Sequence, residues 1–357
     1  MTTSRKKILF LGETYRADAI TWMRGLETFG SFEIVTWELK TSGTGFLNRF
    51  KRIVEYCGAI FSIRKLVKLH RPDMVIAERT TSYGFLAALS GVQPVAIAQQ
   101  GITDLWPEES LLYPIKKLIQ SYAFRKATLI HAWGNAMTVS MKKARVDMRK
   151  VMVLPKGIDL ELFKKNDEFN PNQLHAIVSR SLFAEYKHAI ILKAFALLKK
   201  QGIGFTLTIV GDGPERRVLE SLCQKLDLAN EVHFTGRIVN SVLPELLRKA
   251  NFYISMPVTE GVSASLFEAM ASGCYPVVSD VFGNQSWITH RENGQLIKTN
   301  DEEMLAQELL WALENPQYRQ QAIVKNRKMV EERANYAVNM KQIADRYHEL
   351  IEQYQNR

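Results

Sequence analysis

Short apolar runs alternate with longer helical patterns along most of this chain, and the alternation limits the folds that it can adopt. The runs are rich in Val, Ile and Leu and are flanked by turn residues. They are KILFLG (7–12), EIVTW (33–37), DMVIA (73–77), PVAIA (94–98), TLIHA (128–132), VMVLP (151–155), HAIVS (175–179), FTLTIVG (205–211), EVHFTG (231–236), NFYISM (251–256), YPVVS (275–279) and GQLIK (294–298). Continuous apolar runs are typical of strands buried on both faces, so the pattern predicts parallel sheets covered by helices.

The polar segment KKNDEFNPNQ (164–173) interrupts this alternation. At 357 residues the chain is long enough for two domains, and such a segment is typical of a boundary between them. We therefore predict an α/β fold with two doubly wound Rossmann-like domains, over residues 1–165 and 166–335, facing a cleft. Residues 336–357 are expected to form a C-terminal helix that packs back on the N-terminal domain. Doubly wound sheets bind ligands at the carboxyl ends of their strands, which would place a ligand in the cleft.

Positive charge is concentrated in the first part of the chain. Residues 1–150 carry 23 Lys and Arg against 12 Asp and Glu, whereas residues 151–357 carry 24 against 25. An excess of this kind can serve nucleic acid, an anionic membrane surface or an acidic substrate. No nucleic-acid-binding motif accompanies the charge, so a nucleic-acid partner is not expected.

The segment 46–71 carries much of that charge and has a helical pattern. Phe50, Val54, Cys57 and Phe61 recur at helical spacing, which predicts a face that packs on the sheet. The opposite, basic face is either simply solvated or docks on anionic lipid, reversibly and in a salt-sensitive way.

The sequence favours a cytoplasmic protein, peripheral on the inner face of the cytoplasmic membrane if the basic face docks on lipid. The start, MTTSRKKILFLGE, lacks the apolar length of a signal peptide, and no run reaches the length of a membrane span. Cys57, Cys223 and Cys274 are far apart in sequence and form neither a disulfide framework nor a metal pattern.

Two carboxylates flank a predicted helix start in EGVSASLFEAM (260–270). Residues 261–265 are predicted to begin a helix and Gly273 to end it, with Glu260 in the preceding loop and Glu268 about two turns in. Phosphates bind at helix N-termini, and carboxylates beside them can accept hydrogen bonds from sugar hydroxyls. The alternative is that Glu260 is a surface acid and Glu268 interacts only with the helix dipole.

Two further segments follow predicted strands. SRSLFAEYKH (179–188) supplies Arg180 and Lys187, which suit a diphosphate near a helix start, although a solvated basic loop is an equally simple interpretation. IVGDGPE (209–215) places Gly211 at a tight turn close to a ligand or, alternatively, in an ordinary strand-to-helix turn.

Together these segments carry a resemblance to a known family. Glu260, seven residues and Glu268, followed by AMASG and YPVVSD, resemble the E-x7-E signature of retaining glycosyltransferases of the group-one (family four) class, which have the GT-B fold. LPKGIDLELF (154–163), SR (179–180), KAFALL (193–198), IVGDGPE and VHFTGRI (232–238) are similar to other motifs of that family in order and spacing. The resemblance is strongest over about residues 150–300.

The resemblance implies roles for residues around the donor. Glu260 would bind hydroxyls of the donor sugar, Glu268 the ribose hydroxyls, and Arg180 and Lys187 the leaving diphosphate; Glu260, Arg180 and Lys187 are the expected catalytic residues. The other implied donor contacts are Gly12, Gly211, the main chain of Ile238 at the base, and the backbone N–H groups of Gly261, Val262, Ser263 and Ala264.

The sequence departs from the family pattern at several positions. Gln100 stands where many members have a histidine, and we take Gln100 and Asp104 as candidate contacts to the acceptor or sugar. Lys187 comes about two residues later than the family's lysine, and His188 stands where a glycine is common. No histidine is assigned a role.

We therefore expect a retaining, metal-independent glycosyltransferase. It would move a sugar from a UDP- or GDP-linked donor to a glycan or lipid-linked acceptor, in the synthesis of cell-surface polysaccharide or lipopolysaccharide. No metal and no cofactor besides the donor substrate is expected. The alternatives are a hydrolysing nucleotide-sugar epimerase, which needs acid/base residues around the reacting carbon, and a non-catalytic nucleotide-sugar-binding protein.

Overall fold

The computed structural model describes residues 5–40, 46–105, 108–165 and 173–356, without the side chains of residues 46–47, 49–50 and 52–53 in the second helix. The chain forms two compact units. The first comprises residues 1–156 and 336–357, and the second comprises residues 157–335. No helix of the described residues has the length and apolar character needed to span a membrane.

The first unit is a parallel sheet of six strands in the order β2-β1-β3-β4-β5-β6. The strands are β1 (Lys7–Leu11), β2 (Glu33–Trp37), β3 (Met74–Glu78), β4 (Val95–Gln99), β5 (Leu129–Ala132) and β6 (Val151–Val153). The helices are α1 (Ala17–Gly30), α2 (Phe46–His70), α3 (Gly84–Leu89), α4 (Tyr113–Lys126), α5 (Asn135–Lys143) and α13 (Tyr336–Gln355). Every residue of β3, β4 and β5 is buried, as the apolar runs predict.

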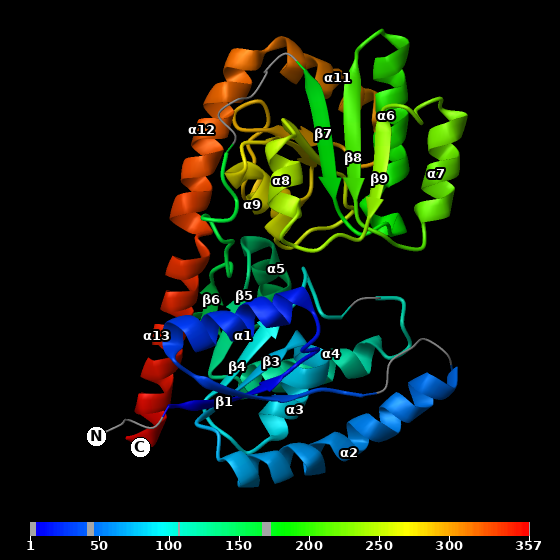
Figure 1. Cartoon of the computed structure of the whole chain (residues 1–357). Coiled ribbons are helices and arrows are strands. Elements are labelled where there is room, and N and C mark those ends of the chain that lie inside the picture. Colours follow the sequence, from blue (N-terminus) through cyan, green and yellow to red (C-terminus); the bar gives the residue numbers. More distant parts are fainter. Residues whose placement is uncertain (1–4, 41–45, 106–107, 166–172, 357) are drawn as a thin grey trace. The chain divides into compact units, whose positions relative to one another are not determined.

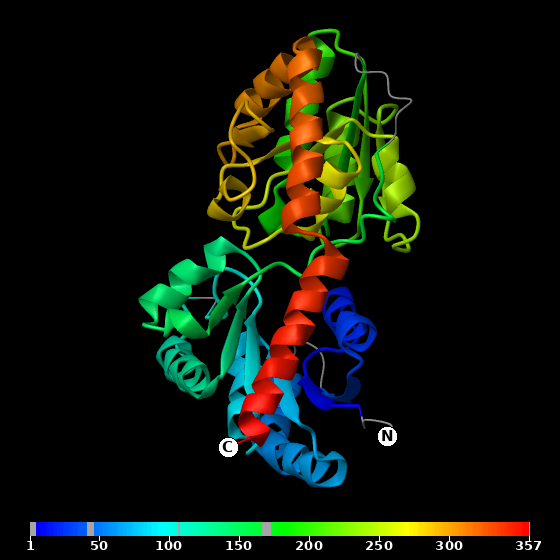
Figure 2. The same ribbon diagram turned by 90° about the vertical axis from the view of Figure 1, so that its left-hand side faces the viewer.

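Helix α13 is the last element of the chain and belongs to the first unit. It lies against α1 (Figure 2). Met340, Ile343 and Tyr347 are fully buried. The hydroxyl group of Tyr347 lies 2.7 Å from Nε2 of His131 in β5. The helix thus reaches the sheet itself and covers part of it.

The second unit is also a parallel six-stranded sheet, in the order β12-β11-β10-β7-β8-β9; β7, β8 and β9 lie side by side in Figure 1. Its strands are β7 (Leu174–Ser179), β8 (Phe205–Val210), β9 (Val232–Gly236), β10 (Phe252–Ser255), β11 (Tyr275–Ser279) and β12 (Gln295–Ile297). Its helices are α6 (His188–Lys200), α7 (Arg216–Lys225), α8 (Leu243–Arg248), α9 (Ala264–Ala271), α10 (Phe282–Gln285), α11 (Glu302–Glu314) and α12 (Pro316–Arg333).

Helices cover both faces of this second sheet. One apolar core joins the sheet to α6, α7 and α11, and a second core joins it to α8, α9 and α12. The two doubly wound α/β domains predicted from the sequence are therefore confirmed, with each expected strand at or within two residues of its predicted place.

The boundary between the units lies earlier in the sequence than the expected boundary at residue 165. The structure divides the chain after Lys156. The reason is packing, because Ile158 and Phe163 are buried in the second unit's core. Ile158 also donates its backbone N–H to Ala334 at 2.9 Å, so the two segments that join the units are hydrogen-bonded to each other. The boundary was predicted from the polar composition of residues 164–173. Residues 166–172 of that segment lie outside the described chain.

Helix α2 presents a different face to solvent from the one expected. Val54 and Phe61 are 57% and 73% exposed, and Cys57 is also exposed. The buried positions are instead Ala59 and Ile63. The predicted packing face was therefore wrong, because the spacing of the larger apolar residues was followed and the small Ala59 was not; Phe50 lies outside the described side chains.

Candidate active site

The predicted donor residues of the second unit gather at the carboxyl edge of its sheet. Strands β7 and β10 are neighbours there. The chain leaves β7 toward α6 on one face of the sheet and leaves β10 toward α9 on the other. In doubly wound sheets such a divergence opens a crevice between the strand ends, and ligands bind in it.

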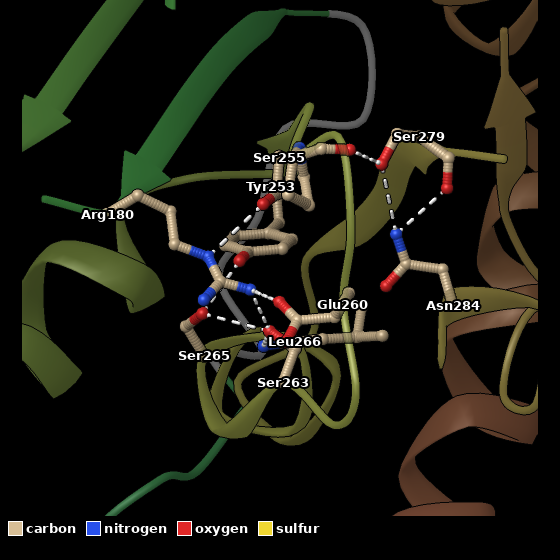
Figure 3. Close-up of polar contacts among 10 residues, drawn as sticks. Arg180, Tyr253, Ser255, Glu260, Ser263, Ser265, Leu266, Ser279 and Asn284 are labelled. Atoms are coloured by element: carbon tan, nitrogen blue, oxygen red, sulfur yellow. Dashed lines mark hydrogen bonds and ion pairs between the residues drawn. The ribbon is translucent and has the colours of Figure 1, made fainter. Parts of the chain in front are cut away.

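Arg180 is the centre of this cluster (Figure 3). It follows β7, and its terminal nitrogen Nη2 donates to the carboxylate of Glu260 and to the hydroxyl of Ser263. Its Nε donates to the hydroxyl of Ser255 at 3.2 Å. Burial favours the neutral guanidine, but the charge of Glu260 outweighs it, so the pKa of Arg180 lies above its usual range. The guanidinium is therefore permanently charged and fixed at three points.

Glu260 is held in a loop whose backbone is itself anchored. The side chains of Arg180 and Glu260 are only 15% and 12% exposed, so their ion pair is largely buried. The Ser279 hydroxyl donates to the carbonyl of Pro257 at 2.8 Å, and the Asn284 side chain donates to the carbonyl of Ser279 at 2.8 Å (Figure 3). These contacts fix the loop that carries Glu260.

Gly283 allows the chain to pass directly beside this loop. A Cβ atom at Gly283 would lie 2.2 Å from the carbonyl oxygen of Glu260, which only glycine avoids. Ser255, Ser279, Gly283 and Asn284 were not predicted from the sequence. Their only signal is position, because each lies at or just after the carboxyl end of a predicted strand.

Helix α9 begins where the sequence predicts. Ser263 is its N-cap, and its hydroxyl accepts from the backbone N–H of Leu266 at 3.2 Å. The hydroxyl oxygen of Ser265 lies 3.1 Å from that of Ser263 and 2.8 Å from that of Tyr253. The segment from Gly261 to Ala264 is therefore the N-terminal approach to the helix, beside a fixed guanidinium. Together they form a positive site suited to phosphate groups.

Glu268 lies little more than one turn into α9, slightly earlier than expected, and is half-buried. Within the described chain its carboxylate accepts no hydrogen bond. Burial raises the pKa of Glu268 to about 7, although the positive charge of Arg180 opposes the rise. An unpartnered carboxylate of this kind is suited to accept hydrogen bonds from hydroxyl groups.

Gly211 and Ile238 lie on neighbouring strand ends. Gly211 has φ 137°, and a Cβ atom there would lie 2.2 Å from the carbonyl oxygen of Arg180. Backbone packing thus explains this glycine without a ligand. Ile238 follows β9 and is half-buried, and in the described residues its backbone N–H and carbonyl make no hydrogen bond.

Lys187 does not join this cluster by any contact in the described chain. It has φ 51° and is the N-cap residue of α6. The residue lines a cavity together with Phe183, Glu215 and Asn300. His188, where the family often has a glycine, is an ordinary first residue of the helix, and the left-handed position is Lys187 itself.

The remaining expected residues belong to the first unit. Gly12 follows β1, and a Cβ atom there would lie 2.9 Å from Oε2 of Glu78. The Gln100 side chain lies 3.4 Å from Oε1 of the same residue. Asp104 accepts from the N–H of Thr80 at 2.7 Å and from that of Gln100 at 3.1 Å, so both its oxygens have structural partners.

Glu78 is a residue that the sequence analysis overlooked. It ends β3, next to the end of β1, and is 3% exposed. Burial and the nearby charge of Asp18 raise the pKa of Glu78 to about 7, while Lys156 and Arg79 oppose the rise. In the described residues, no group of three or more His, Cys, Asp or Glu side chains is arranged to hold a metal ion.

Curated relatives of this chain include glycosyltransferases. The chain is 30% identical over 239 residues to a Bacillus subtilis protein named "Putative glycosyltransferase EpsF"; the match covers 61% of this chain and 60% of that protein. It is 23% identical to an Escherichia coli UDP-Gal:alpha-D-GlcNAc-diphosphoundecaprenol alpha-1,3-galactosyltransferase, over 68% of this chain and 67% of that one. The chain thus spans about three fifths to two thirds of the length of these relatives.

Solved structures and family models agree with this similarity. HepE of Anabaena, solved in complex with UDP, superposes with a TM-score of 0.78 at 18% identity, over 96% of this chain and 100% of that chain. The model of glycosyl transferases group 1 matches residues 159–329, and the glycosyl transferase 4-like model matches residues 44–133. The two matched ranges include the whole site around Arg180 and three of the six strands of the first sheet, β3, β4 and β5. The second unit is thus similar to the group 1 glycosyltransferases, and the chain has the GT-B fold of its structural neighbours.

Proposed function

We propose that this chain is a retaining glycosyltransferase that uses a UDP- or GDP-linked sugar. The observation that carries the proposal is the buried pair of Arg180 and Glu260 at the N-terminus of α9, with the unpartnered carboxylate of Glu268 on the same helix. A guanidinium and a helix N-terminus would stabilise the charge that grows on a departing diphosphate. This stabilisation is needed most in the transition state, which is where it accelerates the reaction.

The two carboxylates would bind the parts of the donor on either side of the diphosphate, namely the sugar and the ribose. Glu260 would exchange part of its bond to Arg180 for hydroxyls of the donor sugar, and Arg180 would then turn its charge to the diphosphate. Glu268 would accept hydrogen bonds from the ribose hydroxyls. Within the second unit, the backbone of Ile238 would complete the donor contacts.

The acceptor we propose is a glycan or a lipid-linked glycan of a cell-surface polysaccharide or lipopolysaccharide. Support comes from the relatives, of which one is named for a diphosphoundecaprenol-linked acceptor. Gln100, beside the buried Glu78, is the residue of the first unit that we assign to acceptor or sugar contact.

Product stereochemistry tests the proposal. The protein would be screened for thermal stabilisation by UDP- and GDP-sugars, and the stabilising donor would then be incubated with lipid-linked glycans. Anomeric proton NMR of a retaining enzyme's product shows the same α configuration as the donor. An inverted product would exclude retention, release of an epimerised sugar would favour the epimerase, and binding without turnover would favour a non-catalytic protein.

We further propose that the first unit docks on an anionic lipid surface through α2. Exposed Val54, Cys57 and Phe61 share one helical face with exposed Lys65 and Lys68. Apolar side chains next to basic ones are suited to the boundary between lipid headgroups and acyl chains. Each basic residue near such a surface contributes on the order of 1 kcal/mol, within a Debye length of about 8 Å.

Helix α4 repeats the arrangement in the same unit. Leu111 just before it is 98% exposed, and Ile115 and Leu118 on it are 53% and 73% exposed. They lie opposite the buried side chains of Ala123 and Phe124. The helix carries four basic residues and no acidic residue, namely Lys116, Lys117, Arg125 and Lys126.

Vesicle co-sedimentation tests this docking. The protein should bind anionic vesicles at low salt, bind them less at high salt, and bind neutral vesicles weakly. Phe61→Ser should lower the bound fraction, whereas Val324→Ser should not, because Val324 is 62% exposed but lies on α12 of the second unit. Equal, negligible binding to both vesicle types at low salt would exclude the membrane and indicate a soluble acceptor.

A further inference from the structure

Tyr186 lies against the guanidinium that the proposed chemistry depends on. The guanidinium carbon of Arg180 is 5.3 Å from the centre of the Tyr186 ring, within the range of a cation–π interaction. Tyr186 ends the short 3-10 turn Ala184–Tyr186 that leads into α6, and its side chain is half-buried. Within the described residues, its hydroxyl group has no hydrogen-bond partner. A donor group is therefore unused directly beside Arg180.

Lys187, one residue later, makes no contact with this cluster within the described residues. Its φ of 51° is a left-handed conformation, which most side chains avoid and glycine adopts freely. Lys187 lines the cavity with Phe183, Glu215 and Asn300, whereas the Tyr186 ring contacts Arg180. The cation expected from the sequence thus lies outside the cluster, and an aromatic residue lies in it.

The next residue adds no second cation. His188 is 2% exposed, and neither of its ring nitrogens has a hydrogen-bond partner within the described chain. Burial and the charge of Arg180 lower the pKa of His188 to about 4, so the ring is neutral near pH 7. Its ring meets the Tyr186 ring edge-on, with centroids 6.3 Å apart, and so helps to fix that ring.

We propose that Tyr186, rather than Lys187, is the second side chain of the diphosphate site: its ring face holds the Arg180 guanidinium, and its hydroxyl donates to a diphosphate oxygen. The inference rests on the proposed function. When a donor sugar engages Glu260, Arg180 loses part of its present support. The ring keeps the guanidinium in place at that moment, and the hydroxyl compensates for part of the charge that a lysine would otherwise neutralise.

Four variants test the assignment by their affinities for UDP or GDP and for the matching nucleoside. Tyr186→Phe keeps the ring and should lose about tenfold or more in affinity for the diphosphate, since hydrogen bonds to charged groups are strong, with little change for uridine or guanosine. Tyr186→Leu removes the ring as well and should further lower kcat. Lys187→Gly should cost less diphosphate affinity than Tyr186→Phe and should raise Tm, because glycine suits the left-handed position. Tyr318→Phe, at an exposed position of α12, is the matched control and should leave both affinities unchanged.

The outcomes separate the two levels of the proposal. Wild-type affinity for Tyr186→Phe together with a marked loss for Lys187→Gly would overturn the role of Tyr186 and leave the glycosyltransferase intact. If the unaltered protein binds no nucleoside diphosphate at all, the proposed function itself fails. A Tyr186→Phe variant that loses diphosphate and nucleoside affinity equally would indicate a structural role and would also overturn the inference.

Discussion

Arg180 has two roles at the scale of a single residue. It neutralises the carboxylate of Glu260 in the structure described, and it would neutralise the diphosphate once a donor binds. Arg180→Ala should therefore lower kcat by about 10²–10³-fold, in the range seen when one stabilising donor is removed. Affinity for the free nucleoside should change much less, since the guanidinium acts on the phosphates. Steady-state kinetics and nucleoside titration measure the two effects.

The same substitution leaves Glu260 buried without its partner, which destabilises folds by about 3–5 kcal/mol. The double variant Arg180→Ala, Glu260→Gln removes that unpaired charge and should recover much of the stability without recovering turnover. Recovery of turnover would contradict the proposed roles of both Arg180 and Glu260 in the reaction.

Glu268 should make nucleotide binding depend on pH. Because burial raises the pKa of Glu268 to about 7, the carboxylate is mostly protonated near pH 6 and mostly ionised near pH 8. The ionised form accepts the stronger hydrogen bonds from ribose, so affinity should rise through this window and fall as pH is lowered. Glu268→Gln should lower kcat/KM by about tenfold to a hundredfold and flatten the dependence.

Nucleoside rather than nucleotide should be titrated for this comparison, because the phosphate of the nucleotide ionises in the same range. A pH profile for Glu268→Gln that matches that of the unaltered protein would contradict the assignment of Glu268 to ribose.

The turn after β8 supports the site at the scale of an element. Gly211→Ala would place a Cβ atom 2.2 Å from the Arg180 carbonyl oxygen at a residue with φ 137°. We expect a loss of more than about 2 kcal/mol in the free energy of unfolding, with weaker diphosphate binding because Arg180 is displaced. Gly204→Ala is the control, since a Cβ atom there meets nothing within 4 Å. Urea denaturation of both variants measures the difference. Equal midpoints would show that the turn accommodates the added methyl group without a loss in the free energy of unfolding.

The elements themselves could be predicted because each carries a local signal. Apolar runs such as KILFLG predict buried strands, and Ser263 and Gly273 predict the start and end of α9. The boundary after Lys156 could not be predicted, because it depends on the burial of Ile158 and Phe163 against residues far away in sequence. The buried face of α2 was missed for a different reason, because the small Ala59 is a weaker signal than the larger apolar residues around it.

The site was predictable where the resemblance supplied residues, and less so elsewhere. Arg180 and Glu260 lie in one cluster, where they form an ion pair that the sequence did not predict, and Glu268 lies on the expected helix. The position of Lys187 was not predictable, since a left-handed residue at the N-cap of α6 leaves no mark in the sequence when it is not glycine. Nothing in the sequence marks Tyr186, because its contact with Arg180 is formed only in the folded chain.

At the scale of the whole molecule, the nucleotide site should respond as part of the second unit. We expect UDP or GDP to slow amide hydrogen exchange in residues 180–188 and in α9, and to leave the edge strand β12 unchanged. Hydrogen-exchange mass spectrometry measures this directly. Protection confined to peptides of residues 1–156 would contradict the assignment of the donor to the second unit.

The whole enzyme should also work without a divalent ion. Activity is expected to survive EDTA, because Arg180 and the N-terminus of α9 supply the positive charge for the leaving group. Complete loss in EDTA that Mg²⁺ or Mn²⁺ restores would overturn the metal-independent mechanism.

Helix α13 has a consequence for the order in which the chain can mature on the ribosome. The second unit is contained in residues 157–335, whereas the first needs residues 336–357 to bury Trp22, Phe32 and His131 against Tyr347. Domains generally fold as their segments emerge. The unit that begins first is therefore completed last, and until α13 emerges a nascent chain exposes the apolar surface that chaperones recognise.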